Sequence, residues 1–111
     1  MEAVYIRIDK KHIKVPLDNI LYLEAAGSYL KLVTLKGEFS LSQNLSQFLR
    51  KNEIPVLIRT HRSYIINLNR VDSFDKESVY IRRNKIPISN NYREKFISRI
   101  HCLWEASYDK L

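Results

Sequence analysis

The sequence predicts a mainly β domain of antiparallel strands with two helices. Short apolar runs with a period of two recur along most of the chain, whereas two segments place apolar residues at the i, i+3, i+4 spacing of a helix. The 111 residues suit a single domain spanning 1–111, for which we expect one core. A hydrophobic content of 45%, with two glycines and three prolines, favours a folded domain over a disordered or fibrous chain.

The first two-fifths of the chain predicts strands joined as an antiparallel meander. The expected strands are 4–8, 12–15, 20–24, 29–34 and 38–41. Turns are expected at 9–11, at 16–19, which could also form a single helical turn, at 25–28, and at Lys36 with Gly37. Glycine at position 37 permits a tight turn.

A first helix is predicted over 43–51, with Ser42 as its N-cap. Leu45, Phe48 and Leu49 form its apolar face, which we assign to the core. Short strands then follow at 56–58, 71–74, 78–81 and 85–88, with hairpin turns expected at 76–77 and 83–84.

A second helix is predicted to begin after Ser89, whose hydroxyl can cap it. Its apolar face consists of Tyr92, Phe96, Ile100, Leu103 and Trp104. Cys102 falls among these apolar residues, so we expect a buried structural thiol.

Composition limits the possible partners and cofactors. The formal net charge of +7 favours an acidic partner, whether DNA, RNA or an anionic membrane surface. No apolar run is long enough to span a bilayer and no signal-peptide core follows Met1, which predicts a cytoplasmic protein. Cys102 is the only cysteine, which excludes an intramolecular disulfide and a cysteine-based zinc site. We expect no metal and no cofactor.

The run 58–67 combines apolar strand formers with hydrogen-bonding side chains. Two arginines, a histidine, a threonine and a serine occupy positions 59–63. The guanidinium fork suits phosphate or guanine, and the smaller polar side chains can donate to phosphate oxygens. In a regular strand, Arg59 and His61 point to one side and Thr60 and Arg62 to the other. These residues can therefore face one surface only if the strand breaks near His61.

The chain resembles the LytTR family of bacterial DNA-binding domains. The resemblance rests on four blocks in family order: 20–29, Leu45 with Phe48 and Leu49, 59–67, and 86–89. The third block contains the motif Arg-x-His-Arg-Ser-Tyr at residues 59–64, and this motif is the part of the resemblance most specific to the family. Together the blocks cover nearly the whole chain.

The resemblance implies an elongated fold of antiparallel sheets that places loops and strand ends in successive major grooves. It implies double-stranded DNA sites with direct repeats, two copies of the domain on each site, and a role in transcription regulation. Many relatives are two-component response regulators with an N-terminal receiver domain, for which this chain has no room. We therefore expect either an excised C-terminal domain or a stand-alone regulator.

Three positions correspond to the family's base contacts: Tyr29, Arg62 and Asn90. Asn90 stands where relatives often carry arginine, and its amide suits adenine better than guanine. For Tyr29 the alternative is the edge of the core with a solvated hydroxyl, and for Arg62 it is a surface arginine paired with a carboxylate.

A second set of residues is predicted to contact DNA phosphates. The set is Ser28, Lys31, Arg59, His61, Ser63, Ser89, Asn91, Arg93 and Lys95. We expect the last four at the start of the second helix, where the amides and the dipole favour an anion. His61 could instead support its loop, and Ser89 could be a simple cap.

Residues beside these candidates are assigned to structure. Tyr64, Ile65, Ile66 and Phe48 are assigned to the core, and Asn67 to a turn or a clamp on the backbone. We expect none of these five to touch DNA.

Three other classes of function remain to be compared with DNA binding. An RNA-binding β module suits the basic charge, but the chain lacks the glycine-aromatic strand motif of RNA-recognition sheets. A nuclease has little support, because His12, His61 and His101 are far apart and form no metal or nucleophile pattern. A protein-interaction or membrane-surface module is also disfavoured, because the basic residues do not follow one amphipathic helix. We therefore predict that the chain is not an enzyme.

Overall fold

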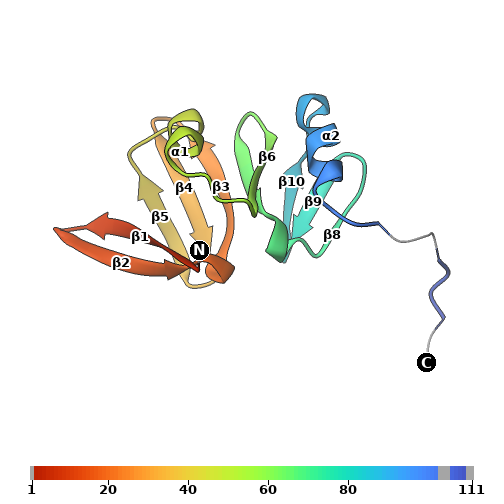
Figure 1. Cartoon of the computed structure of the whole chain (residues 1–111), viewed down its shortest axis with the longest axis horizontal. Coiled ribbons are helices and arrows are strands. Elements are labelled where there is room, and N and C mark those ends of the chain that lie inside the picture. The colour runs from red at the N-terminus through yellow and green to blue at the C-terminus, as the bar shows by residue number, and fades with distance from the viewer. Residues whose placement is uncertain (1, 103–105, 110–111) are drawn as a thin grey trace.

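The computed structural model describes residues 2–102 and 106–109. Within these residues the chain forms ten strands, two α-helices and two short 3-10 turns (Figure 1). The elements are β1 (Ala3–Ile8), β2 (Lys11–Pro16), a 3-10 turn (Leu17–Asn19), β3 (Ile20–Ala26), β4 (Tyr29–Thr34), β5 (Gly37–Leu41), α1 (Leu45–Lys51), β6 (Leu57–His61), β7 (Tyr64–Asn67), a 3-10 turn (Leu68–Arg70), β8 (Ser73–Phe74), β9 (Ser78–Ile81), β10 (Asn84–Pro87) and α2 (Asn90–Ser98). The prediction of a mainly β fold with two helices is confirmed.

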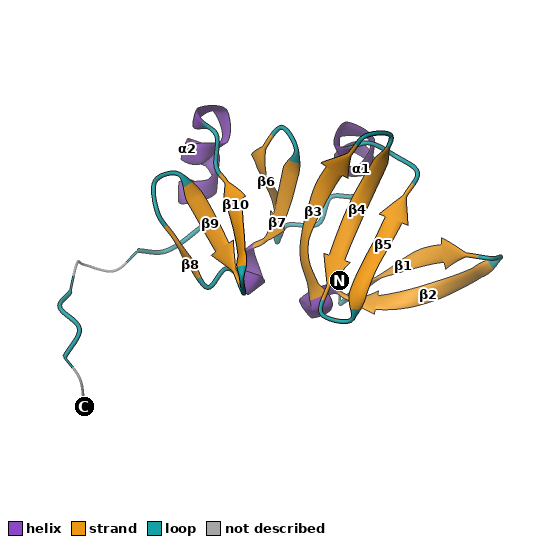
Figure 2. Cartoon of the chain, turned by 180° about the vertical axis from the view of Figure 1, so that it is seen from behind, coloured by secondary structure: helices purple, strands orange, loops and turns teal. Residues whose placement is uncertain are grey.

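All strand pairs are antiparallel and fall into three sheets. A five-stranded sheet with the order β5-β4-β3-β7-β6 lies in the middle. The two-stranded ribbon β1-β2 lies at one end of the molecule, and the sheet β10-β9-β8 with α2 lies at the other (Figure 2). The molecule is elongated, with extents of 53 × 33 × 24 Å.

The prediction of one core is wrong, because the central sheet buries both of its faces. Side chains alternate between the faces of a strand, and neighbouring residues such as Ile65 and Ile66 therefore enter different clusters. The first cluster is closed by α1 and the ribbon, the second by β9, β10 and α2. The first comprises Val15, Leu17, Ile20, Leu23, Leu30, Leu32, Leu45, Phe48, Ile54, Leu57 and Ile65, and the second comprises Leu21, Val33, Ile58, Ile66, Val79, Ile81, Ile86, Ile88 and Phe96.

A β-bulge in β3 adjusts this strand to the two clusters. The pairing of β3 with β4 shifts between Ile20 and Tyr22. A bulge inserts one extra residue and locally reverses the alternation. Leu21 and Tyr22 consequently both pack on the second cluster, while Ile20 and Leu23 pack on the first.

Several predicted boundaries differ from the structure. The strand predicted to end at Glu24 continues to Ala26, and the turn consists of Gly27, with φ of 63°, and Ser28. The strand predicted at 71–74 is reduced to Ser73 and Phe74. The turns predicted at 36–37 and 83–84 each lie one residue earlier.

The first helix starts two residues later than predicted, because Asn44 rather than Ser42 caps it. The Asn44 Oδ1 accepts a bond of 2.8 Å from the Gln47 N–H, and the Gln47 Oε1 accepts one of 2.9 Å from the Asn44 N–H. This reciprocal capping box satisfies two backbone donors at once. The predicted apolar face is confirmed, with Leu45 and Phe48 buried and Leu49 half-buried.

The second helix is shorter than predicted and ends at Ser98. The Ser98 hydroxyl donates to the Lys95 carbonyl, and Ile100 reaches the second cluster from an irregular segment beyond the helix. Leu103 and Trp104 lie outside the described residues. The prediction of a buried thiol is wrong, because Cys102 follows the helix and is exposed.

Candidate nucleic-acid interface

Three loops gather along one edge of the molecule, which we call the loop edge. It consists of the β3-β4 turn at Gly27 and Ser28, the β6-β7 turn at Arg62 and Ser63, and the start of α2 at Asn90 (Figures 1 and 2). Backbone bonds connect its parts. The Ala25 N–H donates to the Ser63 carbonyl over 2.9 Å, and the Ser89 N–H donates to the Thr60 carbonyl over 2.9 Å. The structure thus brings Tyr29, Arg62 and Asn90 to one edge.

The β6-β7 hairpin presents Arg62 at its tip. The register shifts between Arg59 and His61, so that Thr60 forms a bulge, and β6 ends at His61. The strand thus ends at the position where a break is needed for the side chains of this run to face one surface. Thr60 is fully buried, and its Oγ1 has no hydrogen-bond partner among the described residues. Arg62 is exposed, and nothing in the described part of the chain bonds its guanidinium.

Arg59 points its guanidinium at the backbone of the same hairpin. Its Nε donates to the His61 carbonyl over 3.2 Å and its Nη2 to the Arg62 carbonyl over 2.6 Å. Its Cζ also lies 5.4 Å from the ring centroid of Tyr92, a cation–π distance. Two of the donors predicted to meet phosphate are therefore used within the protein.

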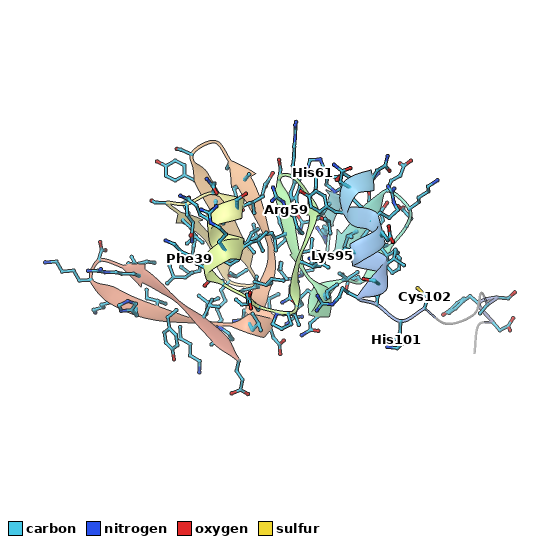
Figure 3. All side chains as sticks on the ribbon, turned by 45° about the horizontal axis from the view of Figure 1, so that its top comes forward. Phe39, Arg59, His61, Lys95, His101 and Cys102 are labelled. Carbon is cyan, nitrogen blue, oxygen red and sulfur yellow. The ribbon has the colours of Figure 1, made fainter. Side chains whose placement is uncertain are left out.

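His61 supports the turn through one nitrogen of its ring. Its Nδ1 accepts a bond of 3.1 Å from the Ser63 N–H. Since Nδ1 is the acceptor in this bond, Nε2 is the ring nitrogen that can act as a donor. The ring packs edge-on against Tyr64, with centroids 5.8 Å apart. Figure 3 shows Arg59 and His61 together on β6, beside α2.

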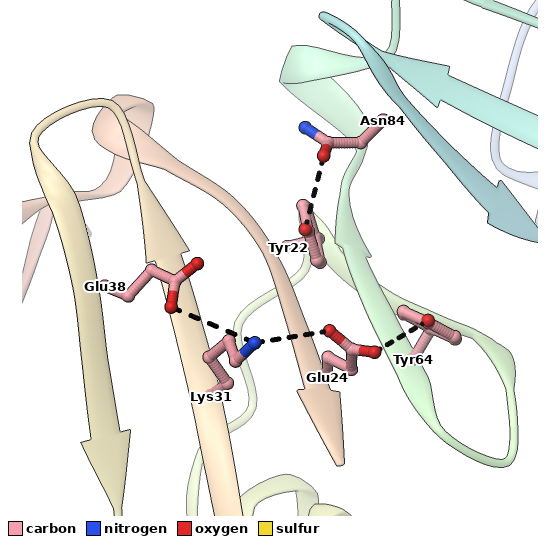
Figure 4. Close-up of polar contacts among 6 residues, drawn as sticks. All are labelled: Tyr22, Glu24, Lys31, Glu38, Tyr64 and Asn84. Atoms are coloured by element: carbon pink, nitrogen blue, oxygen red, sulfur yellow. Dashed lines mark hydrogen bonds and ion pairs between the residues drawn. The ribbon is translucent and has the colours of Figure 1, made fainter. Parts of the chain in front are cut away.

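The β3-β4 turn presents Ser28 and Tyr29, both exposed, with 55% of Tyr29 accessible. Lys31 is placed differently, on a face of the sheet between two carboxylates (Figure 4). Its Nζ lies 3.9 Å from an oxygen of Glu24 and 3.9 Å from one of Glu38.

Glu24, which lies beside Lys31, also forms a hydrogen bond with the β6-β7 hairpin. Its Oε2 accepts a bond of 2.8 Å from the Tyr64 hydroxyl (Figure 4). Burial, followed by this bond and the charge of Glu24, raises the pKa of Tyr64 to about 12. Tyr64 is only half-buried, so its assignment to the core is confirmed for the ring but not for the hydroxyl.

The start of α2 offers amide and hydroxyl donors. Ser89 is the N-cap residue, yet its hydroxyl makes no capping bond, and Asn90 and Asn91 are exposed. Arg93 holds this end in place, since its Nε donates to the Lys76 carbonyl over 2.6 Å, its Nη1 to the Asn90 Oδ1, and its Nη2 to the Ile88 carbonyl over 3.3 Å. Asn90 is exposed, and its amide nitrogen has no hydrogen-bond partner among the described residues.

Lys95 does not lie at the start of this helix as predicted. It is exposed in the last turn of α2, near Arg99 and the loop at Pro55 (Figure 3). It lies five positions after Asn90, which is more than one helical turn.

The sequence did not single out Tyr92 or the Thr60 carbonyl as parts of this edge. Tyr92 was assigned to the apolar face of the helix, and its position under Arg59 depends on a pairing of distant segments. Asn67, in contrast, is the predicted backbone clamp: its Nδ2 donates to the carbonyls of Leu17 (3.0 Å) and Ile20 (2.8 Å).

The loop edge presents exposed hydrogen-bond donors from three segments, and such donors suit phosphate oxygens and base edges. Residues 10–101 match the family described as the LytTr DNA-binding domain. The chain belongs to this LytTR family, as its sequence blocks indicated. No helix in residues 2–102 and 106–109 has the length and apolarity to cross a membrane.

Known proteins agree with this membership. The chain is 26% identical over 100 residues to the transcriptional regulatory protein YpdB of Escherichia coli K12, and equally to that of Shigella flexneri. The alignment covers 84% of this chain but 41% of YpdB, so the chain spans about two-fifths of these relatives. A solved LytTr DNA-binding domain, from a Bacillus cereus protein described as a methyl-accepting/DNA response regulator, has the same fold. Its TM-score is 0.71 at 21% identity, over 89% of this chain and 96% of that one.

Proposed function

We propose that the chain binds double-stranded DNA in a sequence-specific manner as the output domain of a bacterial transcription regulator in the cytoplasm. The observation that carries this proposal is that the segments bearing Tyr29, Arg62 and Asn90 lie along one loop edge (Figures 1 and 2). The relatives' description as transcriptional regulatory proteins, and their greater length, support a parent protein of the two-component response-regulator type with a receiver domain.

The proposed base contacts differ in what they offer. Arg62 supplies a free guanidinium fork, which matches the O6 and N7 acceptors of guanine. Asn90 has its Oδ1 held by Arg93, so its amide presents N–H donors to a purine acceptor. Pairing with both adenine groups also uses this oxygen, which has a second lone pair besides the one that accepts from Arg93. Tyr29 lies at the neighbouring turn, where it can enter a groove.

The proposed phosphate contacts form two groups. Ser28, His61 Nε2, Ser63, Ser89, Asn91 and Lys95 keep donors available to an incoming phosphate. Lys31, Arg59 and Arg93 are engaged with Glu24, Glu38 or backbone carbonyls, so a contact with phosphate must use their remaining N–H groups or replace these partners. Phosphate contacts set the affinity and its salt dependence, whereas base contacts set the sequence.

Selection of bound duplexes from a random pool tests the proposal. The selected duplex and a scrambled control are then titrated at several salt concentrations. We expect a direct repeat, bound by two copies, with an affinity at least about a thousandfold above the control. Sequence-specific binding would be refuted if no sequence were enriched and if the affinity for both duplexes fell equally as the salt concentration rose. Tighter binding to single-stranded RNA of matched length would assign the chain to the RNA-binding class.

A further inference from the structure

Arg59 connects two parts of the loop edge that are distant in sequence. Its Nε and Nη2 bond the His61 and Arg62 carbonyls, at 3.2 and 2.6 Å, and so hold the β6-β7 turn from below. The same guanidinium lies over the ring of Tyr92 in the first turn of α2, 5.4 Å from its centroid. One side chain therefore contacts both the turn that carries Arg62 and the helix that carries Asn90.

The backbone forms a second connection at the same place. Thr60 is the extra residue of the β6 bulge, and its carbonyl accepts the Ser89 N–H over 2.9 Å. A bulge leaves a residue out of the strand ladder, which frees its carbonyl for another partner. The junction is anchored by Thr60 itself, which is fully buried.

We propose that Arg59 and Tyr92 form a clamp that fixes the distance and orientation between Arg62 and Asn90, and thereby the spacing of base pairs that the domain accepts. This proposal rests on the proposed function, in which both residues contact bases. Arg59 and Tyr92 are positioning residues, because they act through Arg62 and Asn90. A rigid connection makes a duplex with altered spacing lose one of the two contacts.

The clamp explains the arginine better than a phosphate contact does. Arg59 is half-buried, and two of its N–H groups already donate to carbonyls of the β6-β7 turn. Moving the guanidinium to a phosphate would give up both bonds and the contact with the ring of Tyr92. Lysine keeps the charge but cannot reproduce the planar fork or its stacking. Arg59→Lys therefore separates the two roles.

The experiment compares four variants with the wild type. Arg59→Lys and Tyr92→Leu remove the fork and the ring, and Tyr92→Phe keeps the ring as the conservative variant. Arg99→Lys is the matched control, since Arg99 also donates to a carbonyl, that of Pro55 over 2.6 Å, away from the loop edge. Each is titrated with the selected duplex and with duplexes that carry one base pair more or fewer between the positions mapped to Arg62 and Asn90.

We expect Arg59→Lys and Tyr92→Leu to reduce the preference for the correct spacing by about tenfold, in line with the loss of a cation–π contact and a bond to a carbonyl. The slope of affinity against salt should be unchanged, because no charge is removed from the interface. Tyr92→Phe and Arg99→Lys should keep the preference. Equal affinities of Arg59→Lys and wild type for every duplex, or equal losses on all of them, would overturn the clamp.

Amide hydrogen exchange without DNA distinguishes this proposal from the proposed function. Exchange at Arg62, Ser63 and Ser89 should be faster in Arg59→Lys and Tyr92→Leu than in wild type or Arg99→Lys, because these amides lie in the two joined segments. Unchanged exchange would overturn the clamp even if DNA is read. If the wild type selects no DNA sequence, the proposed function is refuted. Faster exchange in the two variants would then still show that Arg59 and Tyr92 hold the two segments together.

Discussion

Arginines near the loop edge either stabilise the fold or remain available to a ligand, and their hydrogen-bond partners determine which role each has. Arg59 and Arg93 donate to carbonyls of irregular segments, where strand and helix bonds leave acceptors unpaired. Arg62 stands at a hairpin tip and keeps its fork for an outside acceptor. The sequence places Arg59 and Arg62 in one family block and Arg93 in the second helix, but it does not separate the structural from the binding role.

Arg62→Ala should weaken the selected DNA by about 1–3 kcal/mol and flatten the preference at one base position, because one guanidinium fork is lost. Lys95→Ala should weaken selected and scrambled DNA alike and lower the salt slope by about one, as expected of a phosphate contact. Titration of both variants on both duplexes measures this. Equal losses of Arg62→Ala on the two duplexes would contradict its assignment to a base.

The hydroxyl of Tyr64 should lose its proton at an unusually high pH. Its pKa is raised from 10.0 to about 12 by burial and by Glu24, so the folded state holds the proton more tightly than the unfolded state. The stabilisation is complete below pH 10 and is lost as the pH rises toward about 12. Wild type should therefore lose stability in this window, and Tyr64→Phe should lose less.

NMR of labelled tyrosine rings checks the titration, with Tyr64→Phe identifying the signal. Glu24→Gln should lower the pKa of Tyr64 but keep it above 10, because burial, the largest cause, remains. A Tyr64 that titrates at 10 in the wild type would contradict the bond to Glu24.

At the scale of elements, local chemistry explains the helices and turns better than periodicity does. Both helices were predicted, and the first begins where the Asn44 side chain caps it, whereas the Ser89 side chain makes no capping bond at the start of the second. Their ends were less predictable, because Ile100 continues the helical spacing yet reaches the core from an irregular segment. The bulges at Leu21 and Thr60 had no sequence signal, since the cross-strand register depends on partners distant in the chain.

Asn44→Ala should lower the free energy of unfolding by about 1 kcal/mol, because it removes the side chain that caps a helix of seven residues. Ser42→Ala is the matched control, and it should change stability by less than about 0.5 kcal/mol. Urea unfolding of the three proteins measures both effects. A larger loss of stability for Ser42→Ala than for Asn44→Ala would indicate that Ser42 is the N-cap, as the sequence predicted.

At the scale of the whole molecule, two clusters share one sheet. Leu23 and Ile81 are fully buried in the first and the second cluster, respectively. The five-stranded sheet contributes side chains to both clusters. If one cluster unfolds, the strands that also support the other cluster are disrupted. The chain should therefore unfold as one unit in spite of its two clusters.

Leu23→Ala and Ile81→Ala should each lower the free energy of unfolding by about 2–5 kcal/mol and leave a single transition. Ile13→Ala, at an exposed position of the ribbon, should change it by less than about 0.5 kcal/mol. Circular dichroism and tyrosine fluorescence during urea unfolding should give coincident curves. Separate transitions would show that the clusters fold independently.

The sequence alone determined the class of fold, most strands, both helices and the family, because period, turn residues and the Arg-x-His-Arg-Ser-Tyr block are local patterns. Tertiary structure decided that Arg59 contacts Tyr92, that Lys31 lies between Glu24 and Glu38, and that both faces of the central sheet are buried. The physical reason is the same in each case. A side chain's role depends on the free donors and acceptors that distant segments bring to it, and only the packed fold determines which segments meet.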